Sequence, residues 1–116
     1  NYKTGVKGIS FKMEAGKENA TVAVEIHLPN MMLQHQYFEV FINFATQFKK
    51  LAGQGWIMEK EYSNESHQSL SELFIKLKGV NIFKEDDWPS IISFLKKNMI
   101  VLDAFWNDYK PAFECL

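Results

Sequence analysis

The chain of 116 residues has no arginine, and all thirteen of its positive side chains are lysines. Arginine grips phosphates and guanine edges through two parallel hydrogen bonds, so its absence removes the commonest means of recognising nucleic acid. Fourteen acidic residues bring the formal net charge to −1, with the two signs interspersed along the chain. We therefore expect weak nucleic-acid binding at most, and no attraction to an acidic membrane surface.

Cysteine and long apolar runs are also scarce. Cys115 is the single cysteine, so no intramolecular disulfide can form and the composition suits a reducing compartment. Lys, Asp or Asn interrupts each apolar stretch well before the roughly 20 residues that a membrane-spanning helix needs. No charged segment followed by an apolar one opens the chain. We therefore expect a cytoplasmic protein that does not enter a membrane.

Recognisable catalytic motifs are absent as well. The sequence has no nucleophile paired with a base, no cysteine metal cluster and no glycine-rich phosphate loop. We assign no catalytic residue and no cofactor. What the chain does have is apolar material, with 47% hydrophobic and 15% aromatic residues, which is ample for the core of one domain covering residues 1–116.

Two alternating segments near the start of the chain predict a β-hairpin. Apolar and polar residues alternate over residues 8–14 and again over residues 20–28, with a short polar turn between them. Apolar residues then recur at steps of three and four from Leu33 to Leu51. This spacing predicts an amphipathic helix that Gly53 ends.

The second half of the chain follows the same order. Alternation from Trp56 to Tyr62 and again around Leu73 to Leu77 predicts a second pair of strands. The segment Asp86-Asp87-Trp88-Pro89 is typical of a helix start, because it offers a capping carboxylate and a proline in the first turn. The last helix should run for about six turns, limited by Pro111.

The sequence thus predicts an α+β fold. The order strand, strand, helix, strand, strand, helix favours a two-layer sandwich, in which both helices cover one face of an antiparallel sheet.

Two pairs of residues lie two positions apart on predicted strands, so each pair shares one face of its strand. Glu25 and His27 form the first pair, and Glu59 and Glu61 form the second. Carboxylates and imidazoles bind divalent metals, which makes these four residues weak candidates for a metal site. A solvated sheet face carries the same pattern, and a metal site needs further ligands, so we expect no bound metal.

Candidates for a contact surface are apolar. Ile57 and Phe74 interrupt the polar face of the predicted strands, and Trp106 belongs to the aromatic last helix. We expect these residues to contact a protein partner or a second copy of the chain. Packing at a sheet edge accounts for Ile57 and Phe74 equally well.

Several segments resemble DUF4268, a bacterial family catalogued only as a domain of unknown function. The resemblance covers nearly the whole chain and rests mostly on core and capping positions. The similar segments are Tyr2-Lys3-Thr4-Gly5, Ile9-Ser10-Phe11-Lys12-Met13, Gly79-Val80-Asn81-Ile82-Phe83, Trp88-Pro89-Ser90-Ile91-Ile92-Ser93-Phe94-Leu95 and Leu102-Asp103-Ala104-Phe105-Trp106.

The resemblance implies a small stand-alone protein or the tail domain of a longer chain with a nuclease-like part. It also implies a helix before the Tyr2 region, which we expect this domain to lack, so that an apolar patch is exposed or covered by another copy. Two hypotheses follow. The favoured one is a non-catalytic interaction or accessory module that self-associates as a homodimer; the alternative is a metal-dependent phosphodiester-cleaving enzyme, or a degenerate relative, acting on nucleic acid.

Overall fold

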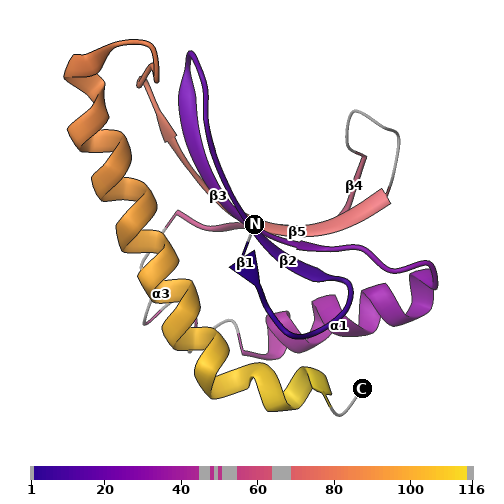
Figure 1. Cartoon of the computed structure of the whole chain (residues 1–116). Helices are drawn as coiled ribbons and strands as arrows, with labels where there is room; N and C mark the ends of the chain where they lie inside the picture. Colours follow the sequence, from indigo (N-terminus) through magenta and orange to yellow (C-terminus); the bar gives the residue numbers. More distant parts are fainter. Residues whose placement is uncertain (1, 45–47, 49, 51–54, 64–68, 115–116) are drawn as a thin grey trace.

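A computed structural model describes residues 2–44, 48, 50, 55–63 and 69–114, except for the side chains of residues 2, 3, 61–63 and 69. The described residues form one five-stranded antiparallel sheet together with two α-helices and a short 3₁₀ helix (Figure 1). The elements are β1 (Tyr2–Lys3), β2 (Ile9–Ala15), β3 (Asn19–Ile26), α1 (Met31–Asn43), β4 (Ile57–Ser63), β5 (Ser69–Lys78), η1 (Glu85–Asp87) and α3 (Trp88–Glu114). The α+β class and the antiparallel sheet expected from the sequence are confirmed.

The strands lie in the order β1-β2-β3-β5-β4. The first hairpin closes at Gly16, whose N–H donates to the Asn19 carbonyl over 2.9 Å. Strand β1 is absent from the order expected from the sequence. It has two residues and pairs Tyr2 with Phe11. A strand this short has too few residues for alternation to reveal it.

One face of the sheet supplies the core. Phe11, Val24 and Leu73 are neighbours across β2, β3 and β5, and each is at most 3% exposed. Both helices pack against this apolar face and share one core cluster with it, on the same side of the sheet in Figure 1. Burial of such side chains contributes about 1.5–3 kcal/mol each to folding.

Helix α1 begins at an asparagine cap and ends earlier than the apolar spacing predicts. The Asn30 side chain accepts a hydrogen bond from the Leu33 N–H over 3.2 Å. The helix ends at Asn43, and Phe44 forms a turn that packs its ring 4.4 Å from the Tyr109 ring. Phe48 is again helical, but the expected end at Gly53 lies outside the described residues.

Helix α3 is longer than expected. It spans 27 residues and continues through Pro111 to Glu114. The reason is Phe113, which is 1% exposed and packs its ring 4.7 Å from Phe41 and 5.2 Å from Trp106. This packing holds the last turn in place although proline offers no N–H for the helix ladder.

The start of α3 also differs from the capping expected. Helix η1 precedes it, and the Asp87 carboxylate accepts a hydrogen bond from the Asn81 N–H over 2.9 Å. Asp87 therefore fixes the loop that follows β5.

Candidate functional site

The sheet face opposite the helices is called the open face here. Strand alternation places on it the residues between those that enter the core. They are Ser10, Lys12 and Glu14 of β2, Thr21, Ala23 and Glu25 of β3, Glu72, Phe74 and Lys76 of β5, and Ile57 and Glu59 of β4.

The strand register sorts these residues into rows across the sheet. Glu25, Glu72 and Glu59 are direct neighbours on β3, β5 and β4, and they form the acidic row. The next row is the apolar row, which contains Ala23, Phe74 and Ile57, with Lys12 at its end on β2. The open face therefore carries an apolar centre beside a line of carboxylates.

Lys12 partly neutralises the acidic row. Its Nζ lies 3.4 Å from Glu25 Oε1 and 3.7 Å from Glu14 Oε1. Burial acts to lower the pKa of Lys12, but the attraction of Glu25, Glu14 and Glu72 outweighs it and raises the pKa above the ordinary value. Lys12 thus stays charged and ties β2 to the end of the acidic row.

Glu72 lies in the middle of the acidic row, and the pKa of its carboxyl is raised. Its burial, followed by the negative charges of Glu25 and Glu59, raises the pKa of the Glu72 carboxyl from 4.5 to about 7. The Lys12 charge works in the opposite direction without cancelling the effect. Near neutral pH the acidic row therefore holds a carboxyl that is partly protonated.

The apolar row gives the open face its hydrophobic character. Ile57 is 50% exposed, and Phe74 is half-buried beside the small and buried Ala23. The Lys76 ammonium lies 5.7 Å from the centre of the Phe74 ring, within the range of a cation–π contact. Two of the three contact candidates from the sequence, Ile57 and Phe74, thus lie next to each other across two strands.

Trp106 lies in the core instead. It is 3% exposed, its Nε1–H donates to the Thr4 carbonyl over 2.7 Å, and its ring centre is 5.7 Å from that of Phe11. The expectation that Trp106 belongs to a contact surface is therefore corrected, because its side of α3 faces the sheet.

The structure describes the side chains of three of the four metal candidates, Glu25, His27 and Glu59, and does not group these three as ligands. Among the described residues, no group of three or more His, Cys, Asp or Glu side chains is placed to hold a metal ion. His27 lies one residue beyond β3, and its main-chain N–H donates to the Gly8 carbonyl over 2.8 Å. Glu59 faces Glu72 rather than a lysine, and the side chain of Glu61 lies outside the described part of the chain.

A break in β4 also undoes the expected equivalence of Glu59 and Glu61. The register with β5 shifts between Glu59 and Tyr62. A bulge of this kind interrupts the alternation of side chains, so a spacing of two no longer guarantees a shared face. The sequence carries no visible signal for this shift.

Sequence reasoning missed Glu72. Its alternation with Phe74 and Lys76 places it on the open face and was available in the sequence. Its position between Glu25 and Glu59 depends on β5 pairing with both β3 and β4, which alternation within one strand does not reveal.

Comparison with known proteins gives a family and no activity. A family model described as Domain of unknown function (DUF4268) matches residues 1–110. The chain belongs to this family. No curated protein and no solved structure matches it significantly. In the described part of the chain, no helix combines the length and the apolar character needed to cross a bilayer.

Proposed function

We propose that this chain is a non-catalytic interaction module of the bacterial cytoplasm that self-associates through its open face. The observation that carries the proposal is the apolar row, where Ile57 is 50% exposed beside Phe74 on a sheet face that no described helix covers. An exposed isoleucine beside a half-buried phenylalanine, framed by charges, forms a small apolar patch of the kind that protein contact surfaces use.

The charges along β5 favour a second copy as the partner. Glu72 and Lys76 lie two residues before and after Phe74 on the same face. A twofold axis running across the strands at Phe74 brings the two Phe74 rings together. It also places Glu72 of each copy opposite Lys76 of the other. The surface is thus complementary to itself in both apolar character and charge.

Analytical ultracentrifugation over a range of concentrations tests the proposal. We expect the wild-type chain to form a dimer as its concentration rises and the Phe74→Asp variant to remain monomeric, because a carboxylate would be desolvated at the contact. Phe83→Asp is the matched control, since Phe83 is 74% exposed outside the sheet and its replacement should leave the dimer intact. A wild-type chain that stays monomeric at its highest soluble concentration would refute the proposal.

A charge exchange tests the twofold arrangement itself. Glu72→Lys and Lys76→Glu should each weaken the dimer, because each places like charges opposite one another. The double variant should recover most of the lost affinity, since the pair is restored with reversed signs. Additive weakening in the double variant would show that Glu72 and Lys76 do not face each other across the contact.

The alternative function, metal-dependent cleavage of phosphodiesters, rests on the acidic row alone. Titration calorimetry with Mn²⁺ and Mg²⁺ and a cleavage assay on single- and double-stranded DNA test it. Two results together would favour the enzyme over the interaction module. One is a heat of metal binding that is lost in the Glu72→Gln variant, and the other is cleavage of DNA.

A further inference from the structure

In the part of the chain that the structure describes, the last residues of β5 have main-chain groups without a partner on one side. The Gly79 N–H donates to the Glu18 carbonyl over 3.0 Å, so Gly79 faces β3. Main-chain groups of successive strand residues point to opposite sides, which directs Ile75 and Leu77 towards β3 and directs Lys76 and Lys78 away from it. The Lys76 and Lys78 N–H and C=O groups therefore point towards the side on which β4 lies.

Strand β4 does not extend far enough to use these groups. Its pairing with β5 begins with Ile57 opposite Phe74, and Gly55 and Trp56 are not part of a strand. Trp56 instead turns into the core and packs its ring 5.0 Å from Phe48. Within the described residues, no main-chain hydrogen bond reaches Lys76 or Lys78 from this side.

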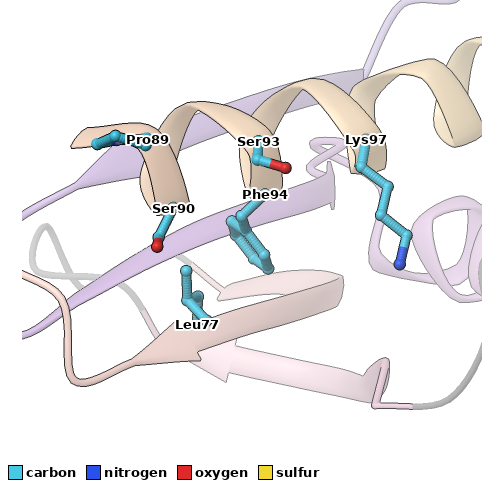
Figure 2. Close-up of a pocket in the computed structure, with 6 residues that line it drawn as sticks. All are labelled: Leu77, Pro89, Ser90, Ser93, Phe94 and Lys97. Atoms are coloured by element: carbon cyan, nitrogen blue, oxygen red, sulfur yellow. The ribbon is translucent and has the colours of Figure 1, made fainter. Parts of the chain in front are cut away.

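A hollow lies beside this edge. It measures about 530 Å³ and is lined by Leu77 of β5 and by Pro89, Ser90, Ser93, Phe94 and Lys97 of α3. Figure 2 shows Leu77 and Phe94 pointing towards each other at its floor, with Ser90 and Lys97 reaching down from the helix. The hollow thus combines an apolar floor with two hydroxyls and one ammonium group.

Three lysines surround the edge, while the acidic residues of η1, Glu85–Asp87, lie just before Pro89 at one end of the hollow. Lys76 and Lys78 are exposed on the strand, Lys97 is exposed in the hollow, and none of them forms an ion pair with a described carboxylate. A segment that adds to this edge meets lysines on both of its faces. An acidic segment therefore fits better than a neutral or basic one.

We propose that β5 binds an extended acidic segment of a partner protein, which pairs as an added strand with Lys76 and Lys78 in line with β4. Main-chain hydrogen bonds to the two lysines supply the pairing, and alternate side chains of the segment supply the specificity. Apolar side chains on one face of the segment enter the hollow over Leu77 and Phe94. Acidic side chains on the other face lie beside the Lys76 and Lys78 ammonium groups.

The strand site and the dimer contact share the Lys76 side chain but depend on different groups. The dimer depends on the Ile57 and Phe74 side chains of the open face, whereas the added strand depends on the main-chain groups of Lys76 and Lys78. Either proposal can therefore fail while the other stands.

Residue-resolved amide exchange by NMR tests the edge. In the free chain we expect the Lys76 and Lys78 amides to exchange quickly and the Ile75 and Leu77 amides to be protected, because only the latter pair with β3. The probe is a short acetylated peptide in which glutamate and valine alternate. Its addition should slow exchange at Lys76 and Lys78 and shift the signals of Leu77, Ser93 and Phe94.

Matched variants separate the contributions. Lys97→Glu should weaken binding of the peptide at least about three-fold, whereas Lys96→Glu, one residue along the same helix and outside the hollow, should not. Lys78→Pro should abolish the protection of Lys76 by removing one outward N–H, and Lys78→Ala controls for the lost charge.

Three results would overturn the proposal. The first is protection of Lys76 and Lys78 in the free chain equal to that of Ile75 and Leu77. The second is equal binding of a lysine–valine peptide or no binding of the acidic one. The third is peptide-induced shifts confined to Ile57 and Phe74, which would assign the peptide to the open face instead.

Discussion

The Glu72 carboxyl lies between two others in a row that crosses three strands. Its raised pKa, about 7, means that the folded chain holds a proton on Glu72 at pH values where the unfolded chain has released it. Stability therefore falls as the pH rises from 4.5 towards about 7, and levels off above that range.

Replacement of Glu72 by glutamine should remove this penalty. We expect Glu72→Gln to be more stable than the wild type at pH 8 by about 1 kcal/mol, a value that allows for solvent screening at a half-buried site. The difference should vanish at pH 4, where Glu72 is protonated in both states. Urea unfolding at concentrations that keep the chain monomeric measures it. The exposed Glu85→Gln is the control, and an identical pH profile for both variants would contradict the assigned cause.

Gln34 forms a buried polar junction between α1 and the sheet. It is fully buried, its Oε1 accepts from the Leu28 N–H over 3.0 Å, and its Nε2 donates to Ser71 Oγ over 3.3 Å. Ser71 Oγ in turn donates to the Lys60 carbonyl. These hydrogen bonds connect α1 to the segment after β3 and to β5 directly, and to β4 through Ser71.

Loss of this side chain should cost more than its size suggests. We expect Gln34→Ala to lower the free energy of unfolding by about 2–3 kcal/mol, because it leaves buried partners without hydrogen bonds. Gln36→Ala changes the same residue type two positions along α1 at an exposed site, so it should change stability by less than about 0.5 kcal/mol. Equal losses in the two variants would show that the buried junction is not responsible, because alanine favours helix at both positions.

At the scale of elements, the end of α3 depends on one aromatic anchor. The Phe113 ring lies between rings of α1 and α3, including Tyr37 at 6.0 Å and Phe41 at 4.7 Å. This contact joins the two helices on the far side of Pro111. Local sequence preference for a helix end is overruled by tertiary packing.

Truncation of this anchor should be costly. We expect Phe113→Ala to lower the free energy of unfolding by about 3–5 kcal/mol, since it leaves a cavity among buried rings. Phe83→Ala removes the same ring from a position that is 74% exposed and should cost less than about 0.5 kcal/mol. Thermal unfolding followed by circular dichroism measures both, and a small loss in Phe113→Ala would show that the last turn is held by other contacts.

Most strands and helices could be predicted from the sequence, whereas the pairing of the strands and the packing of the helices could not. Alternation identified β2, β3, β4 and β5 because each has one apolar and one polar face. The pairing of β5 with both β3 and β4 joins residues that are distant in sequence, so it could not be derived from local pattern. The same limit explains the outcome at the site. Ile57 and Phe74 could be recognised in the sequence, because each is an apolar residue on an otherwise polar strand face. The acidic row and the inward orientation of Trp106 arise only from tertiary packing.

At the scale of the molecule, one core cluster joins the sheet to both helices. It includes Trp56 and Trp106, while Trp88 is 45% exposed on α3. A core shared in this way favours unfolding in a single cooperative step.

Two probes should therefore report the same transition. We expect urea unfolding curves from indole fluorescence and from far-ultraviolet circular dichroism to superimpose, with one midpoint. The Trp88→Phe variant removes the exposed indole and restricts fluorescence to the core. Separate midpoints in this variant would indicate that the sheet and α3 unfold independently.

The hydrogen bond between the Trp106 indole and the Thr4 carbonyl joins residues that are 102 positions apart. During synthesis, the first strands leave the ribosome long before the aromatic residues that cover them. Phe11, Val24 and Leu73 share one core cluster with Phe105, Trp106 and Phe113, so the part of their apolar face that α3 covers stays exposed until translation has passed residue 113. Ribosome stalling before Trp106 should therefore leave the nascent chain sensitive to protease.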